Sequence, residues 1–381
     1  MVIHRLLDIK ALLAKKSFFL FGPRATGKSF LANQQLPTDT PVFDLLRNDL
    51  YLTLSANPGA FAEMLAAYPQ AKLIVIDEIQ RLPILLNEVH RQIEQRGVTF
   101  LLTGSSSRKL KLAGVNLLAG RAWQAELFPL TSQEIPDFNL QRYLQYGGLP
   151  AIYNSTDPED ELYAYTHTYL RDEIQAEALV RNLPVFSKFL QLSALSSGHM
   201  LNFTAISNEI GVTAATIREY YQVLADTFLG FMLPSWRKSV QRQPVATAKF
   251  YYFDLGVRNA LIQNYHIPDK TELFGHAFEH FIAMELSAYL SYTRQKLPLS
   301  YWHTKHGYEV DFIIGDQIAI EVKSTTQIQS KHLKSLRMLQ QENICQQYFL
   351  VSCDAFARQT EGVLCLPWQT FLSRLWEGEL L

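Results

Sequence analysis

Short runs of apolar residues recur in the first third of the chain, and each run ends in small or polar residues. They cover residues 17–21, 73–78 and 98–107. Apolar runs of about four to eight residues indicate strands buried on both faces, as in a parallel sheet. Residues 82–96 instead repeat apolar side chains at helical spacing, namely Leu82, Ile84, Leu85, Val89 and Ile93. This alternation predicts a doubly wound α/β fold with a mostly parallel sheet.

A glycine-rich segment directly follows the first predicted strand. Gly22, Gly27, Lys28 and Ser29 match the P-loop pattern, which requires a strand before the loop and a helix after it. The glycines let backbone N–H groups surround phosphate oxygens, the lysine approaches the β- and γ-phosphates, and the serine hydroxyl binds Mg²⁺. We therefore predict that ATP and Mg²⁺ bind here. The predicted nucleotide-binding residues are Gly22, Pro23, Arg24, Ala25, Thr26, Gly27, Lys28, Ser29 and Phe30.

Two carboxylates end the second predicted strand, Asp77 and Glu78. Open α/β sheets bind their ligands at the carboxyl ends of the strands. We expect Asp77 to bind the nucleotide Mg²⁺ together with Ser29, and Glu78 to activate the attacking water.

Hydroxyl residues end the third predicted strand, where Thr103, Ser105 and Ser106 are candidates for sensing the γ-phosphate and Ser105 is preferred. An ordinary serine-rich loop explains these residues equally well. Arg121 follows a glycine, and an arginine there can reach a nucleotide on its own or a neighbouring subunit, or can simply lie on the surface. The predicted catalytic residues are Lys28, Glu78, Ser105 and Arg121.

The middle of the chain predicts a long helix over residues 161–180 and then a helix-turn-helix. Thr204 is expected to cap the first helix, Gly211 to make the turn, and Thr213 to cap the second helix. The β-rich residues 228–233 follow, which gives the layout of a winged helix-turn-helix. Such a unit binds DNA or serves protein contacts. The residues expected to meet DNA are Thr213, Thr216, Arg218, Trp236, Arg237, Lys238 and Arg242.

Charged residues interrupt two apolar strands in the last third of the chain. Asp311 lies at the centre of a strand over residues 308–314, and Glu321 and Lys323 face the same side of a strand over residues 317–325. This hairpin arrangement is typical of metal-dependent nucleases with a restriction-endonuclease-like fold. Asp311 and Glu321 are predicted to bind Mg²⁺, and Lys323 to orient water or stabilise charge. A salt-bridge cluster without nuclease activity is the alternative.

Two helices flank this predicted hairpin. Glu279, on the helix over residues 272–290, is expected to complete the nuclease Mg²⁺ site. A basic helix over residues 330–339 carries Lys331, Lys334 and Arg337, which either line a nucleic-acid cleft or form a solvated face.

The composition adds limits to this picture. The formal net charge is −1, so any DNA binding has to rest on a local patch. The 3 cysteines show no CxxC spacing, which argues against a zinc site or a disulfide framework. No window approaches the roughly 18 apolar residues of a membrane span. We therefore expect a cytoplasmic protein without a membrane partner.

At this point the chain resembles a known family, the prokaryotic AAA-type ATPases that carry a C-terminal domain of unknown function. The residues that carry the resemblance are Gly22–Arg24, Gly27–Ser29, Asp77–Gln80, Thr103–Ser107, Leu118–Arg121, Leu127–Thr131 and Gly147–Pro150. The resemblance covers the whole chain. Ala25 and Thr26 depart from the Gln-Val that this family more often shows, and Ser29 replaces its commoner Thr.

Three domains follow from these observations: an AAA-type P-loop ATPase domain over 1–150, a helical connector and winged helix-turn-helix over 151–265, and a restriction-endonuclease-like α/β domain over 266–381. We predict an ATPase that couples turnover to nucleic-acid binding or processing. The alternative is an ATP-controlled switch whose C-terminal domain is non-catalytic and serves as a docking or DNA-binding surface. A small-molecule kinase is disfavoured because Glu78 directly follows Asp77. Arg121 also suggests a homo-oligomer with a shared site.

Overall fold

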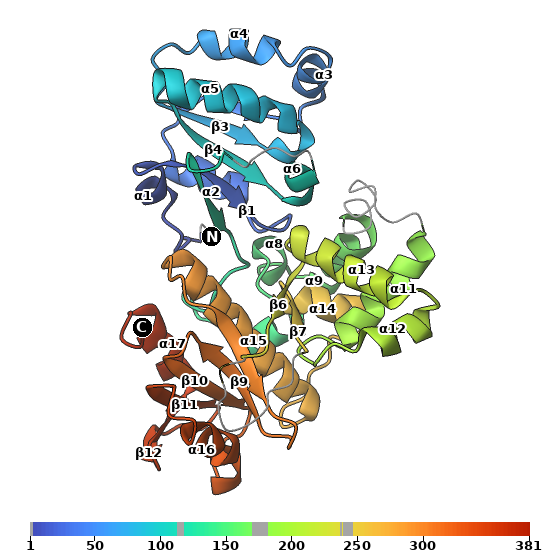
Figure 1. Cartoon of the computed structure of the whole chain (residues 1–381), viewed down its shortest axis with the longest axis vertical. Helices are drawn as coiled ribbons and strands as arrows, with labels where there is room; N and C mark the ends of the chain where they lie inside the picture. The colour runs from blue at the N-terminus through green and yellow to red at the C-terminus, as the bar shows by residue number, and fades with distance from the viewer. Residues whose placement is uncertain (1–2, 113–117, 170–181, 237, 239–246) are drawn as a thin grey trace.

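Three groups of elements make up the computed structural model, which describes residues 3–112, 118–169, 182–236, 238 and 247–381. Figure 1 shows the N-terminal sheet at the top, the C-terminal sheet at the bottom, and most of the middle helices at the right. The long helix α15, Glu272–Tyr292, runs from the C-terminal sheet toward the N-terminal domain.

The N-terminal domain is built on a five-stranded, fully parallel sheet of order β2-β3-β4-β1-β5. Its strands are β1 Ser17–Phe21, β2 Val42–Asp44, β3 Leu73–Asp77, β4 Thr99–Gly104 and β5 Ala122–Glu126. Its α-helices are α1 Ile9–Leu13, α2 Lys28–Gln35, α3 Asn48–Ala56, α4 Ala60–Ala66, α5 Leu86–Arg96 and α6 Arg108–Leu112. The predicted parallel α/β sheet is therefore confirmed.

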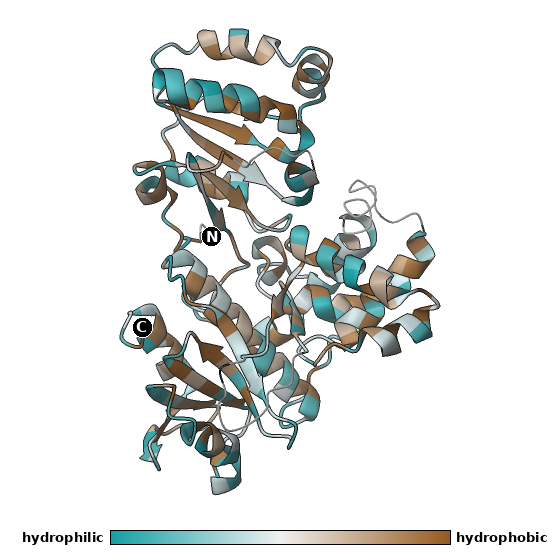
Figure 2. Ribbon diagram, viewed as in Figure 1, coloured by the Kyte–Doolittle hydropathy of each residue, from teal (hydrophilic) through white to brown (hydrophobic). Residues whose placement is uncertain are grey.

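The central strands β1, β3 and β4 are apolar on both faces because both faces are covered, whereas the edge strands β2 and β5 are partly exposed. Phe19 and Phe21 pack into one cluster, whereas Phe18 and Leu20 pack into another cluster with α1 and α2. This two-sided burial explains the continuous apolar runs. Figure 2 shows β3 and much of β4 in brown and the outer face of α5 in teal. The predicted apolar stripe fails at Ile84, which is 49% exposed because a short 3₁₀ turn at Pro83–Leu85 precedes α5.

The middle segment contains a helix-turn-helix beside a two-stranded antiparallel sheet. Its elements are α7 Leu140–Tyr146, α8 Pro150–Tyr153, α9 Pro158–Ala164, α11 Leu183–Leu195, α12 Phe203–Ile210, α13 Ala214–Asp226, β6 Gly230–Leu233, β7 Lys249–Tyr252 and α14 Leu255–Leu261. The cap of α12 differs from the prediction: the Asn202 side chain, not Thr204, accepts from the backbone of Ala205. Thr213 caps α13 and Gly211 makes the turn at a φ of 83°, as predicted.

The predicted long helix over residues 161–180 is only partly described. α9 ends at Ala164, and a π-helical turn follows at Tyr165–Tyr169; residues 170–181 lie outside the described part of the chain. Arg237 and Arg242 also lie outside it.

The C-terminal domain contains a mixed six-stranded sheet of order β12-β13-β11-β10-β9-β8. Its elements after α15 are β8 Leu299–His303, β9 Glu309–Ile314, β10 Ile318–Lys323, α16 Lys334–Gln340, β11 Gln347–Ser352, β12 Arg358–Thr360, β13 Val363–Pro367 and α17 Trp368–Trp376. Side chains alternate between two cores, so that Phe312 packs with α15 and α17 while Ile313 packs with α16. The predicted hairpin is confirmed as β9 and β10, which pair antiparallel.

Helix α7 shows how the domains join. The sequence-based boundary at residue 150 places α7 in the N-terminal domain, yet Tyr143 and Leu144 pack in the core that contains Phe281 of α15. Among the described helices, none combines the length and the apolar character that crossing a bilayer requires.

Candidate functional site

The loop between β1 and α2 contains two glycines whose backbone conformations favour glycine. Gly22 and Gly27 have φ values of 153° and 91°, and a Cβ on Gly22 would lie 2.5 Å from the Leu127 carbonyl oxygen. Only glycine fits such a close approach. The Lys28 ammonium donates to the carbonyls of Gly22 and Pro23, at 2.7 and 3.0 Å, so a positive charge lies at the centre of the loop.

Ser29 and Asp77 meet at the carboxyl edge of the sheet. Ser29 Oγ donates to Asp77 Oδ2 at 2.7 Å, and the Thr103 hydroxyl donates to the other carboxylate oxygen. Hydroxyl and carboxylate oxygens are the ligands that Mg²⁺ prefers beside a bound triphosphate. These residues therefore fit the predicted Mg²⁺ position.

Glu78 lies next to this pair, in a buried cluster with Gln80 and Ser105. Its φ of 60° is in the left-handed region, which is uncommon for a residue other than glycine. Gln80 Nε2 donates to the Glu78 carboxylate and, at 3.1 Å, to Ser105 Oγ, and Ser105 Oγ lies 3.2 Å from Glu78 Oε2. Ser105 was expected at this edge. Gln80 was missed, although its place two residues after Glu78 was a usable signal.

A cavity of about 490 Å³ opens in front of the loop. The N-terminal domain contributes Arg24, Ala25, residues 27–30, Leu46 and Glu78 to its wall. Helices α8 and α9 and the following turn contribute Ala151, Ile152, Glu161, Ala164 and Tyr165. Tyr165 Oη also donates to the Arg24 carbonyl at 3.3 Å. The sequence did not indicate this second wall, because it belongs to a segment more than a hundred residues away.

Arg121 does not join this site. It immediately precedes β5, and Ala122 pairs with Ser17 at the start of β1, whereas the loop follows Phe21 at the other end. The length of β5 separates the two edges by about 13 Å. Arg121 instead forms an ion pair with Glu94 of α5.

The predicted nuclease residues form a second cluster in the C-terminal domain. Lys323 Nζ lies 2.5 Å from Glu321 Oε1 and 3.9 Å from Asp311 Oδ2. Asp311 also accepts from the backbone of Val322 at 2.7 Å, whereas Glu321 Oε2 is buried and has no hydrogen-bond partner among the described residues. Burial raises the pKa of both carboxyls, and Asp311 raises that of Glu321 further.

A lysine from the middle segment completes this cluster. Lys249, on β7, is 3% exposed, and its Nζ lies 3.1 Å from Glu279 Oε1 and 2.6 Å from Glu309 Oε1. Tyr251, on the same strand, donates to Glu279 at 2.5 Å. The sequence indicated neither residue, because β7 comes from a segment with no nuclease-like pattern.

The carboxylates of this cluster are thus held by ammonium groups. Among the described residues, no three His, Cys, Asp or Glu side chains are arranged to hold a metal ion. Mg²⁺ binding by Glu279, Asp311 and Glu321 stays a prediction.

Family comparisons divide the chain into three parts. Residues 14–136 match a family described as "AAA domain". Residues 14–136 are called the AAA domain below, after this similarity. Residues 137–266 and 274–371 match two families described as "Domain of unknown function (DUF8612)" and "Domain of unknown function (DUF4143)". The segment that matches the AAA domain contains the P-loop and the acidic pair, and the other two segments match families without a described function.

Curated relatives are distant. An uncharacterized protein of Haemophilus influenzae is 22% identical over 231 residues, which cover 56% of this chain and 56% of that protein. The chain therefore spans about half the length of that relative. The uncharacterized protein MJ1544 of Methanocaldococcus jannaschii is 21% identical over 82% of this chain and 75% of its own length.

One solved structure also matches in part. It is the replication initiator DnaA bound to AMPPCP and single-stranded DNA, at 13% identity, over 57% of this chain and 86% of that chain. The TM-score of this match is 0.27.

The helix-turn-helix touches the AAA domain directly. Asp226, at the end of α13, accepts from Lys111 Nζ at 2.7 Å and lies 3.5 Å from an Arg108 nitrogen. Its backbone carbonyl accepts from the Ser107 backbone at 3.0 Å. Ser107 is two residues beyond Ser105, which bonds to Glu78. Only these residues therefore separate the Glu78 cluster from the end of α13.

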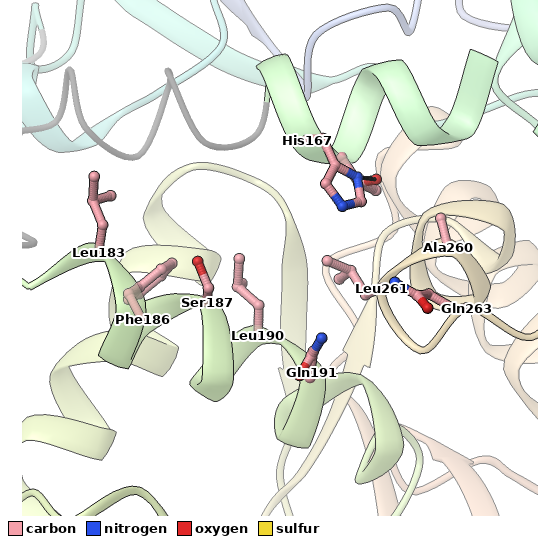
Figure 3. Close-up of a pocket in the computed structure, with 10 residues that line it drawn as sticks. His167, Leu183, Phe186, Ser187, Leu190, Gln191, Ala260, Leu261 and Gln263 are labelled. Atoms are coloured by element: carbon pink, nitrogen blue, oxygen red, sulfur yellow. Dashed lines mark hydrogen bonds between the residues drawn. The ribbon is translucent and has the colours of Figure 1, made fainter. Parts of the chain in front are cut away.

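A smaller cavity of about 150 Å³ lies between α11, α14 and the turn after α9 (Figure 3). Leu183, Phe186 and Leu190 line one side, and His167 faces them from the other. This cavity shares no lining residue with the cavity at the P-loop.

Proposed function

We propose that the protein hydrolyses ATP at the P-loop of the AAA domain and couples turnover to the binding or processing of nucleic acid. Lys28 neutralises the phosphates, Ser29 and Asp77 hold Mg²⁺, and Glu78 accepts a proton from the attacking water. Mg²⁺, when bound with the nucleotide, neutralises charge that develops on the phosphate oxygens. Thr103 and Ser105 position Asp77 and Glu78.

The contact between Ser29 and Asp77, at 2.7 Å, carries this proposal. It brings a hydroxyl and a carboxylate together beside the Lys28 ammonium, at the edge where parallel α/β sheets bind ligands. Glu78 lines the same cavity as Lys28 and Ser29. Metal ligand, phosphate cation and general base thus lie around one space.

The Glu78→Gln variant tests the assignment. Removing the base is expected to lower the ATP turnover rate by about 10²–10⁴-fold, because general-base catalysis contributes that much. Affinity for a fluorescent ATP analogue should stay within about threefold, since Lys28, Ser29 and Asp77 remain. The exposed Glu63→Gln serves as the matched control and should turn over like wild type. Equal turnover by wild type and Glu78→Gln would defeat the catalytic assignment.

Coupling to nucleic acid rests on the contacts at Asp226. A change at Ser105 when nucleotide is bound or hydrolysed shifts Ser107, and Ser107 is bonded to the end of α13. The outer side of α13 exposes Thr213 and Arg218. We therefore expect DNA to raise the turnover rate of wild type, and single- and double-stranded DNA added separately identify the preferred form.

A second candidate function is an ATP-controlled switch with a non-catalytic C-terminal domain. The pairing of Lys249 and Lys323 with the four carboxylates favours it, because ammonium groups already neutralise the positions a metal needs. Mg²⁺-dependent nicking of plasmid DNA, lost in Asp311→Ala, would support the nuclease instead. Wild-type protein that turns over ATP without nicking supports the switch.

A homo-oligomer is also part of this proposal. Because Arg121 lies at the edge of the sheet opposite the P-loop, a nucleotide within its reach has to be bound by a neighbouring subunit.

A further inference from the structure

A second cavity between the domains, larger than the nucleotide cavity, borders Gly22 and Pro23 of the P-loop. The proposed function assigns it no role. It measures about 560 Å³. The AAA domain, α13 with β6, and α15 with β8 each contribute one wall, so the cavity is formed where all three parts of the chain meet. Its apolar lining includes Phe128, Phe228, Phe231, Phe253, Met284 and Leu297.

Glu126 is the one charged residue among the described residues that line this cavity. It ends β5, and no other described residue forms a hydrogen bond or an ion pair with its carboxylate. The nearest influential charge, Lys111, is already paired with Asp226 at 2.7 Å. The side chain is exposed, and it is one of the residues that line the cavity. Desolvation by the surrounding protein still raises the pKa of the Glu126 carboxyl.

The lining combines a large apolar surface with one accessible carboxylate. No group in the described part of the chain pairs with that carboxylate, so the cavity matches a ligand that carries a positive charge on an apolar body. The volume lies within the range of about 300–1000 Å³ that is usual for small-molecule sites, which also occur preferentially between domains. The aromatic lining adds favourable contacts for a cation and for an apolar body.

We propose that this cavity binds a small amphiphilic cation, with the protonated amine on Glu126 and an aromatic or alkyl body between Phe128, Phe231 and Met284. The site lies on the other side of the P-loop from the nucleotide cavity: the two cavities share no lining residue, although Gly22 and Pro23 of the predicted nucleotide-binding set contribute to this one. The proposal does not depend on ATP hydrolysis.

Isothermal titration calorimetry of the full chain without nucleotide tests it. The probes are 4-phenylbutylamine, 4-phenylbutan-1-ol and 4-phenylbutanoate, which share one apolar body and differ in charge. The amine is expected to bind at least tenfold more tightly than the alcohol, and the carboxylate not to bind. Glu126→Gln should bring the amine to within twofold of the alcohol. The control Glu63→Gln should bind all three probes as wild type does.

Filling the cavity gives an independent check. Ala225 lines it from α13, and Ala225→Phe should remove binding of both the amine and the alcohol by at least tenfold. If that variant does not fold, the Glu126→Gln result decides alone. Equal binding of amine and alcohol by wild type, unchanged amine binding by Glu126→Gln, or no binding of the amine at all overturns the proposal.

Discussion

At the scale of single residues, buried ionisable groups are held by partners from distant parts of the chain. Glu285, on α15, is 1% exposed, and its two carboxylate oxygens accept from the Ser132 backbone at 2.6 Å and from Trp376 Nε1 at 2.8 Å. Burial nevertheless raises its pKa to about 7. Two neutral donors thus compensate only part of the cost of removing this carboxylate from water.

This raised pKa predicts that stability falls as the pH rises. Below about pH 4.5 both the folded and the unfolded chain hold the proton of Glu285. Between about 4.5 and 7 only the folded chain holds it, so proton release favours unfolding. The loss amounts to about 3 kcal/mol by pH 8. Urea unfolding of wild type and Glu285→Gln at pH 5, 6, 7 and 8 measures it, and the variant should lose most of the slope.

Two comparisons sharpen this measurement. The exposed Glu377→Gln should keep the full slope. Asp254, whose pKa burial raises to about 6, adds a slope of the same sign, so Glu285→Gln should not become entirely flat. A Glu285→Gln variant with the wild-type pH dependence would contradict the prediction.

The sequence predicted those site residues whose chemistry is tied to a local pattern. The P-loop spacing placed Lys28 and Ser29, and the end of an apolar run placed Asp77 beside them. Gln80 and Lys249 were missed because their roles depend on tertiary neighbours: Gln80 donates to Glu78 and Ser105, and Lys249 enters a cluster whose carboxylates come from other elements.

At the scale of elements, the sequence predicted best those strands that form continuous apolar runs. β1, β3 and β4 are buried on both faces and begin or end within two or three residues of the predicted limits. The start of α12 was misplaced because Asn202 and Thr204 are both acceptable caps, and only the backbone geometry selects Asn202. The sequence did not predict that α7 packs on α15. The apolar face of a seven-residue helix shows that it is buried but does not identify the element that covers it.

Strand β7 joins the middle segment to the C-terminal domain through Lys249, and this contact predicts a large loss of stability. Lys249→Met should cost roughly 3 kcal/mol, because it leaves Glu279 and Glu309 partly buried without their counter-charge. Differential scanning calorimetry measures the change. The exposed Lys72→Met should stay within about 0.5 kcal/mol of wild type.

A double variant separates charge from packing at this strand. Adding Glu279→Gln to Lys249→Met removes one uncompensated carboxylate, so part of the lost stability should return. Losses that simply add would show that Lys249 contributes packing and not charge pairing.

At the scale of the whole molecule, α15 connects the two ends of the structure. Its residue Glu279 lies in the carboxylate cluster, and Tyr292, about 20 Å further along the helix, lies beside the AAA domain. Arg5 joins these parts: its guanidinium donates to the Thr26 carbonyl in the P-loop at 2.8 Å, to Glu134 at 3.0 Å and to Tyr292 Oη at 3.1 Å. A displacement of the loop can therefore reach α15 through one buried side chain.

Tyr292→Phe removes only the hydroxyl from this connection. Tyr292 Oη accepts from Arg5 and from the backbone of Phe128, both at 3.1 Å, whereas the loop keeps its bond to Arg5. We expect the variant to bind a non-hydrolysable ATP analogue within about threefold of wild type. The analogue should slow amide hydrogen exchange along α15 in wild type, and Tyr292→Phe should lose at least half of that protection because α15 no longer follows the loop.

The matched control is Tyr289→Phe, on the same helix one turn earlier, where the ring packs on Trp376 at 5.4 Å between centroids. This variant also removes one hydroxyl oxygen from α15, but at a residue that does not contact Arg5. The protection of α15 amides that nucleotide binding produces should therefore remain. Equal protection in wild type and both variants would mean that α15 senses nucleotide by another route, such as the contact of Asp226 with Ser107, or not at all. Protection lost in both variants would indicate a general loosening of α15, and the Arg5 connection would then carry no specific signal.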